Sequence, residues 1–208
     1  MESVARGGTR WKRFAVVMVP SVAATAAVGI GLAQGVLAAS FSISGQQAKV
    51  KVKELDGTGF IQYGAFDVTH GKERIPVAVS AFRSAELKGL CQSVVVPVPG
   101  IGDVTLRLTA GNGPKVVKAE NLYIDLEQLD ADATFRDINI GIAAGASEQG
   151  PGVKAGDHAD PGGFAQEAKS AYLTDVEQTS WATSAGTFQL SGLSMKVLKG
   201  KGKDVECF

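Results

Sequence analysis

The residues best able to carry out acid–base catalysis in this chain of 208 residues are two histidines, His70 and His158. His158 lies in the run Asp157-His158-Ala159-Asp160, where two carboxylates flank it, and His70 lies in a segment typical of a turn. A lipase-like hydrolase also needs a serine in a Gly-x-Ser-x-Gly turn, and the sequence lacks that motif. We therefore assign no catalytic residue. His70, His158, Asp157 and Asp160 remain the candidates should the protein be an enzyme, and each histidine is first interpreted as an exposed loop residue.

Carboxylates suitable for a hard cation are clustered at two places. Asp157, His158 and Asp160 form one group, and the other comprises Asp125, Glu127, Asp130 and Asp132. Calcium would accept such oxygen ligands, but the twelve-residue ligand loop with its central glycine is missing. Glycine motifs that hold phosphates or dinucleotides are also missing. We predict no metal site and no cofactor, and we interpret the second group as the solvated face of a strand.

Cys91 and Cys207 are the only thiols, separated by 116 positions. They form no Cys-x-x-Cys motif and show no metal-ligand spacing. In an oxidising compartment such a pair favours a disulfide over two free thiols. Closing a loop of this length stabilises a fold by about 4–5 kcal/mol in chain-entropy models. The bridge would also fix a C-terminal tail rich in lysine and glycine.

The first forty residues have the pattern of an export signal. Four basic side chains precede a stretch, residues 14–41, that contains no charge, and small residues follow the apolar middle. Residues 14–37 are also long enough to cross a bilayer as a helix. Two alternatives stay open: a signal peptide that is cleaved near residues 38–40, or a retained anchor with its basic end in the cytoplasm. The protein is expected either in the cell membrane facing outward or secreted into the cell envelope.

Residues 41–208 are expected to form one exported domain. The whole chain has 21 basic and 21 acidic side chains, so no basic excess is available to neutralise nucleic-acid phosphates. An apolar content of 45 % excludes a disordered chain. The membrane, through residues 14–37 if they are not cleaved, is the only partner that the sequence indicates.

Alternation of polar and apolar residues is the dominant pattern of this domain. It is clear over residues 48–53, 104–109 and 122–127, and it predicts strands with one solvated face. Asn112-Gly113 favours a tight turn, so residues 103–127 are predicted to form a hairpin. Residues 145–163, which contain six glycines and two prolines, are predicted to be a long loop. Apolar residues at every fourth position over residues 164–176 predict a helix.

These elements define a mainly β fold. We expect an antiparallel β-sandwich or curled sheet with one short helix, preceded by the N-terminal apolar helix. A weak repeat relates residues 40–50 to residues 187–197. An irregular β-solenoid is therefore the alternative.

Several short stretches of the chain resemble a known family. They are Phe41-x-Ile43-Ser44-Gly45, the run Gly59–Gly64, the run Leu90–Val94, Ala133-Thr134-Phe135 with Ile140-Gly141, and the run Ala182–Phe188. Together they are similar to an uncharacterised exported family of actinobacteria, especially of Streptomyces, over essentially the whole chain. Some members of that family are labelled cholesterol esterase. The resemblance implies an actinobacterial envelope protein and a Cys91–Cys207 pairing.

Three functions are consistent with these observations. The first is a non-enzymatic exported or membrane-tethered protein of the cell surface with a structural or binding role, because strand patterns are abundant and convergent catalytic residues are scarce. The alternative is a steryl or lipid ester hydrolase with an atypical site. The second alternative is a lipid carrier that holds its ligand between apolar strand faces.

Overall fold

Long strands dominate residues 42–208, which are the part of the chain that the computed structural model describes. The predicted signal or anchor and its apolar helix lie outside the described residues. No helix within residues 42–208 is long and apolar enough to cross a bilayer. The strands are β1 (Ser42–Ile43), β2 (Ala48–Thr69), β3 (Arg74–Lys88), β4 (Leu90–Val98), β5 (Gly102–Ala110), β6 (Val117–Arg136), β7 (Asn139–Ala143), β8 (Phe164–Ser184), β9 (Thr187–Gln189) and β10 (Ser194–Lys199).

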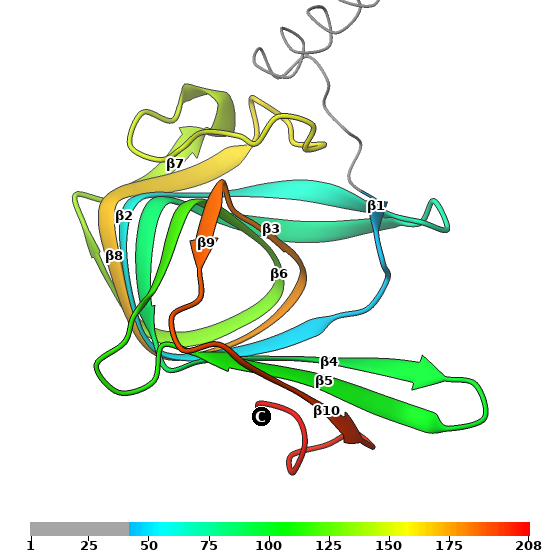
Figure 1. The fold of residues 1–208 in the computed structure, drawn as a ribbon. Helices are drawn as coiled ribbons and strands as arrows, with labels where there is room; N and C mark the ends of the chain where they lie inside the picture. The colour runs from blue at the N-terminus through cyan, green and yellow to red at the C-terminus, as the bar shows by residue number, and fades with distance from the viewer. Residues whose placement is uncertain (1–41) are drawn as a thin grey trace, which may run out of the picture. The chain divides into compact units, whose positions relative to one another are not determined.

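The strands form one sheet that curls until it closes on itself (Figure 1). Its order is β10-β5-β4-β2-β3-β6-β8-β7, and an additional pairing of β2 with β8 completes a ring of β2, β3, β6 and β8. Neighbours in the ring are antiparallel. The prediction of a mainly β, curled antiparallel sheet is confirmed, and the β-solenoid alternative is wrong because these strands reverse direction instead of winding in parallel.

Bending of β2 allows the sheet to close. Residues that face the interior have even numbers at Val50 and Val52, an odd number at Leu55, and an even number again at Phe60. The alternation of inward and outward side chains is therefore shifted by one residue twice within the strand. Gly57 lies between these changes, where a Cβ atom would come within 2.3 Å of the Phe82 ring. A side chain at this position would therefore prevent the close approach of β2 and β3.

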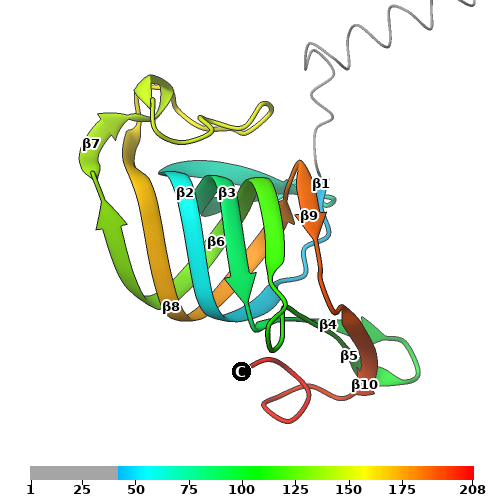
Figure 2. The same ribbon diagram turned by 60° about the vertical axis from the view of Figure 1, so that its left-hand side comes forward.

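The two faces of the ring carry separate apolar clusters. The inner cluster lies inside the closed sheet, where the Phe60 ring is 5.3 Å from the Phe82 ring and 5.1 Å from the Phe135 ring between centroids. The outer cluster, which includes Ile61, Val77 and Val79, lies between the sheet and the glycine-rich segment that follows β7. In Figures 1 and 2 this segment passes over β2 and β3.

Strands β4, β5 and β10 extend from the ring as an arm, and the C-terminal tail lies beside it (Figure 2). The tail is fixed by the Cys91–Cys207 disulfide, whose Cα atoms are 5.8 Å apart. The Cys207 N–H also donates to Ser93 Oγ at 3.1 Å, and Thr105 Oγ1 donates to the Gly200 carbonyl at 2.6 Å. The predicted disulfide is therefore present, and it joins β4 to the end of the chain.

The predicted helix over residues 164–176 is wrong, because this segment is the first part of β8. Among residues 42–208 the only helical element is the short 3-10 turn Ala144–Ala146. Of the four residues behind that prediction, Ala168 and Val176 are buried whereas Phe164 and Tyr172 are exposed, because β8 bends and its pairing with β6 and β7 is irregular. Ala165 therefore contacts the outer cluster, whereas Ala168 and Ala171 contact the inner one.

The predicted hairpin over residues 103–127 is also wrong. The two predicted strands exist as β5 and β6, but they do not pair with each other. Strand β5 pairs with β4 and β10, and β6 pairs with β3, β8 and β9. The segment between them crosses from the arm to the ring. Gly111 fixes this crossing, since its carbonyl accepts from the Gly89 N–H and its N–H donates to the Ser191 carbonyl.

Candidate functional site

Polar side chains gather on the outer face of the ring beneath the glycine-rich segment 145–163. Tyr63 and Asp67 are four positions apart on β2, so both point to this face. The register places Tyr63 opposite Val79 on β3, and Val79 opposite Asp125 on β6. A tyrosine and a buried carboxylate therefore lie in one row across three strands, with only a valine between them.

The glycine-rich segment closes over this row. The Tyr63 hydroxyl donates a hydrogen bond of 2.6 Å to Asp157 Oδ2 and accepts one of 3.0 Å from the backbone N–H of Lys154. The Lys154 ammonium lies 5.9 Å from the centre of the Tyr123 ring. Tyr63 is 2 % exposed, so the segment is anchored on a hydroxyl deep in the site. We call the group of Tyr63, Asp67, Asp125, Lys154 and Asp157 the aspartate cluster.

Burial raises the pKa of two carboxyl groups of the aspartate cluster, those of Asp67 and Asp125. Asp125 is 4 % exposed, and desolvation, followed by repulsion from Asp67, raises its pKa to about 7. Desolvation and the charge of Asp157 also raise the pKa of Asp67, and Lys154 opposes both shifts. Within residues 42–208, Asp67 Oδ2 and Asp125 Oδ1 are buried and accept no hydrogen bond. The Asp125 carboxyl therefore titrates near neutral pH, well above the ordinary range of an aspartate.

Outside the aspartate cluster, the carboxylate of Glu167 on β8 holds the start of the same segment. Its Oε2 accepts from Ser147 Oγ at 2.9 Å and from the backbone N–H groups of Glu148 and Gln149 at 2.8 and 2.9 Å. Its Oε1 accepts from Asn139 Nδ2 at 3.1 Å. Burial alone would raise the pKa of Glu167, but these four hydrogen bonds lower it to about 2.

We expect Glu167→Gln to lower the free energy of unfolding by about 1–3 kcal/mol, because an amide NH₂ group would face donors that now share one carboxylate. The lowered pKa stabilises the native state above about pH 4.5, and this contribution is lost as the pH falls through about 2. Urea unfolding at pH 7 measures the loss. Glu148→Gln is the control, because the Glu148 backbone alone takes part in the network. Equal stabilities of the two variants would contradict the role of Glu167.

The structure separates the residues that the sequence offered as catalytic candidates. Asp157 joins the aspartate cluster, and the neighbouring His158 is exposed but contributes electrostatically to the pKa of Asp67. His70 is exposed in the turn between β2 and β3, and Asp160 Oδ1 accepts from the Gly162 N–H within its own turn. Within residues 42–208 neither histidine hydrogen-bonds to a serine hydroxyl.

The proposed solvated face of β6 requires a correction. Glu127, Asp130 and Asp132 are exposed, but Asp125 is buried beneath the glycine-rich segment. Sequence alternation places Asp125 and Glu127 on one face, but the register of β6 with β8 shifts after Asp125. In the described part of the chain no group of three or more His, Cys, Asp or Glu side chains is arranged to hold a metal ion.

The interior of the ring contains one further candidate site, an apolar cavity of about 110 Å³. Ligand pockets for small molecules are commonly several hundred Å³. The cavity is therefore too small for a sterol and can take only a small apolar group. The residues that line it are Leu55, Phe60, Gln62, Ser80, Phe82, Ile124, Leu126, Leu129, Phe135, Leu173, Val176 and Gln178.

These features define an all-β domain with a closed antiparallel sheet, a loop clamped over buried aspartates and a disulfide-linked arm. Residues 44–208 match the model of a family of unknown function, DUF6230, and the chain belongs to that family. No curated protein sequence shows a significant match. No solved structure does so either.

Proposed function

We propose that the protein is an exported, non-enzymatic domain with a structural or binding role at the surface of an actinobacterial cell. The observation that carries the proposal is the Cys91–Cys207 disulfide, because such bonds persist in oxidising compartments outside the cytosol. The basic and apolar leader in residues 1–40 supplies a route of export. A retained leader would hold the domain on the membrane through residues 14–37.

Accessibility in intact cells tests this proposal. Cells that produce the full chain are treated with a membrane-impermeant, lysine-reactive biotin reagent, and a variant without residues 1–40 is the matched control. We expect labelling of the full chain and none of the control, with a cytosolic protein unlabelled in both. Full-length chain that is unlabelled in intact cells but labelled after lysis would overturn the proposal. The mass of the labelled protein decides between cleavage and anchoring.

The apolar cavity supports lipid carriage as a second candidate function. Its volume of about 110 Å³ is below that of a cavity known to hold benzene, so only part of a lipid, such as the end of an acyl chain, would enter it. Mass spectrometry of organic extracts from the purified protein tests this function. A lipid carried there is expected with the wild-type protein and not with Leu173→Trp, which fills the cavity. Equal amounts of lipid in the wild-type and Leu173→Trp preparations would show that the lipid is not bound in this cavity.

Ester hydrolysis, the activity that the cholesterol esterase label of the resembling family suggests, gives a separate prediction. We expect no hydrolysis of p-nitrophenyl butyrate or cholesteryl oleate above the buffer rate, because neither histidine is hydrogen-bonded to a serine in residues 42–208. A time course with purified protein measures this. Hydrolysis that is lost in His158→Asn but retained in His70→Asn would contradict the non-enzymatic proposal and identify His158 as the base.

A further inference from the structure

Two cations face each other on the arm. Arg107 on β5 and Lys196 on β10 are direct cross-strand partners, so their side chains leave the same face of the sheet. Like charges placed directly opposite each other destabilise a β-sheet. Within residues 42–208 neither side chain makes an ion pair with a carboxylate. The arm therefore contains an uncompensated pair of positive charges.

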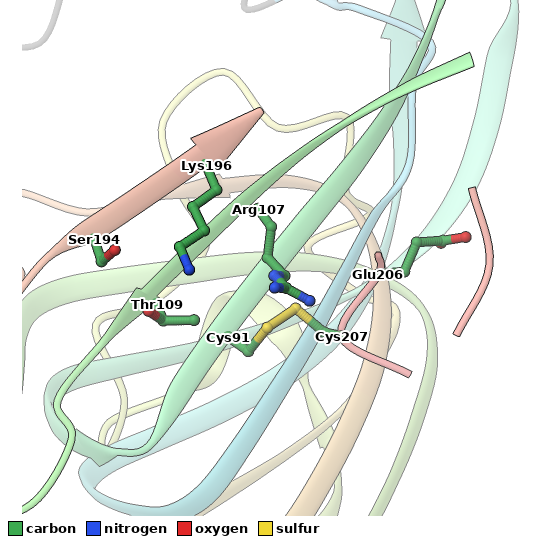
Figure 3. Close-up of a pocket in the computed structure, with 7 residues that line it drawn as sticks. All are labelled: Cys91, Arg107, Thr109, Ser194, Lys196, Glu206 and Cys207. Carbon is green, nitrogen blue, oxygen red and sulfur yellow. A yellow bond between two sulfur atoms is a disulfide. The ribbon is translucent and has the colours of Figure 1, made fainter. Parts of the chain in front are cut away.

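The two cations line a pocket of about 260 Å³ beside the disulfide. Figure 3 shows the Arg107 and Lys196 side chains extending into the same space, toward Thr109 and the bond between Cys91 and Cys207. Ser194 and its cross-strand partner Thr109 also border this space. The complete lining is Cys91, Arg107, Thr109, Ser194, Lys196, Glu206 and Cys207.

The single carboxylate of the lining is already bound elsewhere. Glu206 Oε2 lies 3.1 Å from the Lys49 ammonium, and its Oε1 accepts a hydrogen bond of 2.6 Å from the Gly202 N–H. Its side chain is only 10 % exposed, so these partners hold it in place. The Glu206 carboxylate therefore neutralises Lys49 and accepts a hydrogen bond from the tail. It does not neutralise Arg107 or Lys196, so both cations are available to a ligand.

We infer that this pocket binds a phosphate group, carried either by a small phosphate ester or by a lipid headgroup. A guanidinium offers paired N–H donors that match two phosphate oxygens, and an ammonium adds a point charge. Thr109 and Ser194 at the border add hydroxyl-bearing side chains to the lining. A bound dianion would also remove the repulsion across β5 and β10. The inference goes beyond the proposed function, because it depends on the arm alone and not on export.

Thermal unfolding with inorganic phosphate is the first test. The melting temperature is measured against phosphate concentration at constant ionic strength, with sodium chloride as the balancing salt. We expect phosphate to stabilise the wild-type protein. Arg107→Gln and Lys196→Gln are expected to weaken the apparent phosphate affinity at least tenfold, and Lys196→Gln is expected to raise the melting temperature without phosphate.

Lys199→Gln is the matched control. Lys199 is exposed on the same strand but is paired with Val104 on the opposite face, so the variant removes the same charge and leaves the pocket intact. We expect its phosphate affinity to change less than twofold. An equal phosphate effect in all four proteins would be a general salt effect and would overturn the inference, as would no effect in any of them.

Two further ligands distinguish the source of the phosphate group. Glycerol 1-phosphate represents a soluble ester, and vesicles of phosphatidylglycerol, compared with phosphatidylcholine, represent an anionic lipid. Binding of the soluble ester alone, lost in Lys196→Gln, supports a small-molecule ligand. Sedimentation with phosphatidylglycerol vesicles that Lys196→Gln abolishes and Lys199→Gln preserves supports a headgroup. Binding of either ligand that survives both Arg107→Gln and Lys196→Gln overturns the site.

Discussion

Replacing both Cys91 and Cys207 with serine is expected to lower the free energy of unfolding by about 4–5 kcal/mol. The bridge closes a loop of 116 residues, and opening it returns that conformational freedom to the unfolded chain. The loss is large because the same bond fixes the tail against the arm and, through the 3.1 Å contact of Lys49 with Glu206, against β2. Urea unfolding of the purified oxidised protein and of the double variant measures the difference.

The control for this prediction keeps the bridge and weakens the tail. Lys201→Gln removes an ion pair of 2.9 Å with Asp103, in which the lysine side chain is 68 % exposed. Exposed pairs of this kind contribute about 0–1 kcal/mol, so the variant should unfold almost like the wild type. Hydrogen exchange of residues 200–208 should accelerate strongly only in the double serine variant. If the free energy of unfolding of the double variant lies within about 1 kcal/mol of the wild-type value, the disulfide is not the main stabilising link of the tail.

Replacing Asp125 with asparagine is expected to stabilise the protein at pH 8 and to flatten its stability between about pH 4 and 7. The pKa of Asp125 is about 7 in the native state, against an ordinary value of 3.8. Below about pH 4 the carboxyl is protonated in both states and imposes no penalty. As the pH rises to about 7, the unfolded chain ionises first, so stability falls. Above pH 7 the penalty stays constant, and it is of the order of a few kcal/mol.

Asp132→Asn is the matched control, because Asp132 is an exposed aspartate on the same strand. Its stability profile between pH 4 and 8 should follow that of the wild type. Urea midpoints measured at half-unit pH intervals give all three profiles. A pH dependence of Asp125→Asn that equals the wild-type dependence would contradict the role of this carboxyl. An Asp125→Asn variant that is less stable than the wild type at pH 8 would show that the ionised carboxylate is bound favourably.

Local patterns predicted much of the strand structure correctly. In β2, Val50 and Val52 are buried while Lys51 and Lys53 are exposed, as alternation of polar and apolar residues requires. The predicted hairpin was wrong because β5 and β6 pair with strands that are distant in the sequence, and the predicted helix was wrong because β8 bends. The predicted helix rested on an apolar residue at every fourth position of residues 164–176. In β8 two of these residues, Ala168 and Val176, are buried and the other two, Phe164 and Tyr172, are exposed, so the spacing does not mark one apolar helix face.

The aspartate cluster was harder to predict than the strands. Tyr63 and Asp67 come from β2, Asp125 from β6, and Lys154 and Asp157 from a loop, so only the closed topology brings them together. The sequence did contain one signal, a tyrosine and an aspartate on the apolar face of β2. The proposed phosphate pocket could not be predicted from the sequence either. Only the pairing of β5 with β10 brings Arg107 and Lys196 together, and they are far apart in the sequence.

The central claim is that the domain is exported and oxidised, and the oxidation state of the two cysteines in living cells tests it most directly. Cells that produce the full chain are quenched in acid, free thiols are blocked with an alkylating reagent, and unreduced peptides are analysed by mass spectrometry. The proposed function predicts peptides that contain Cys91 joined to Cys207 in protein made with residues 1–40. Alkylated Cys91 and Cys207 in a full-length chain recovered from the cytosol would contradict it.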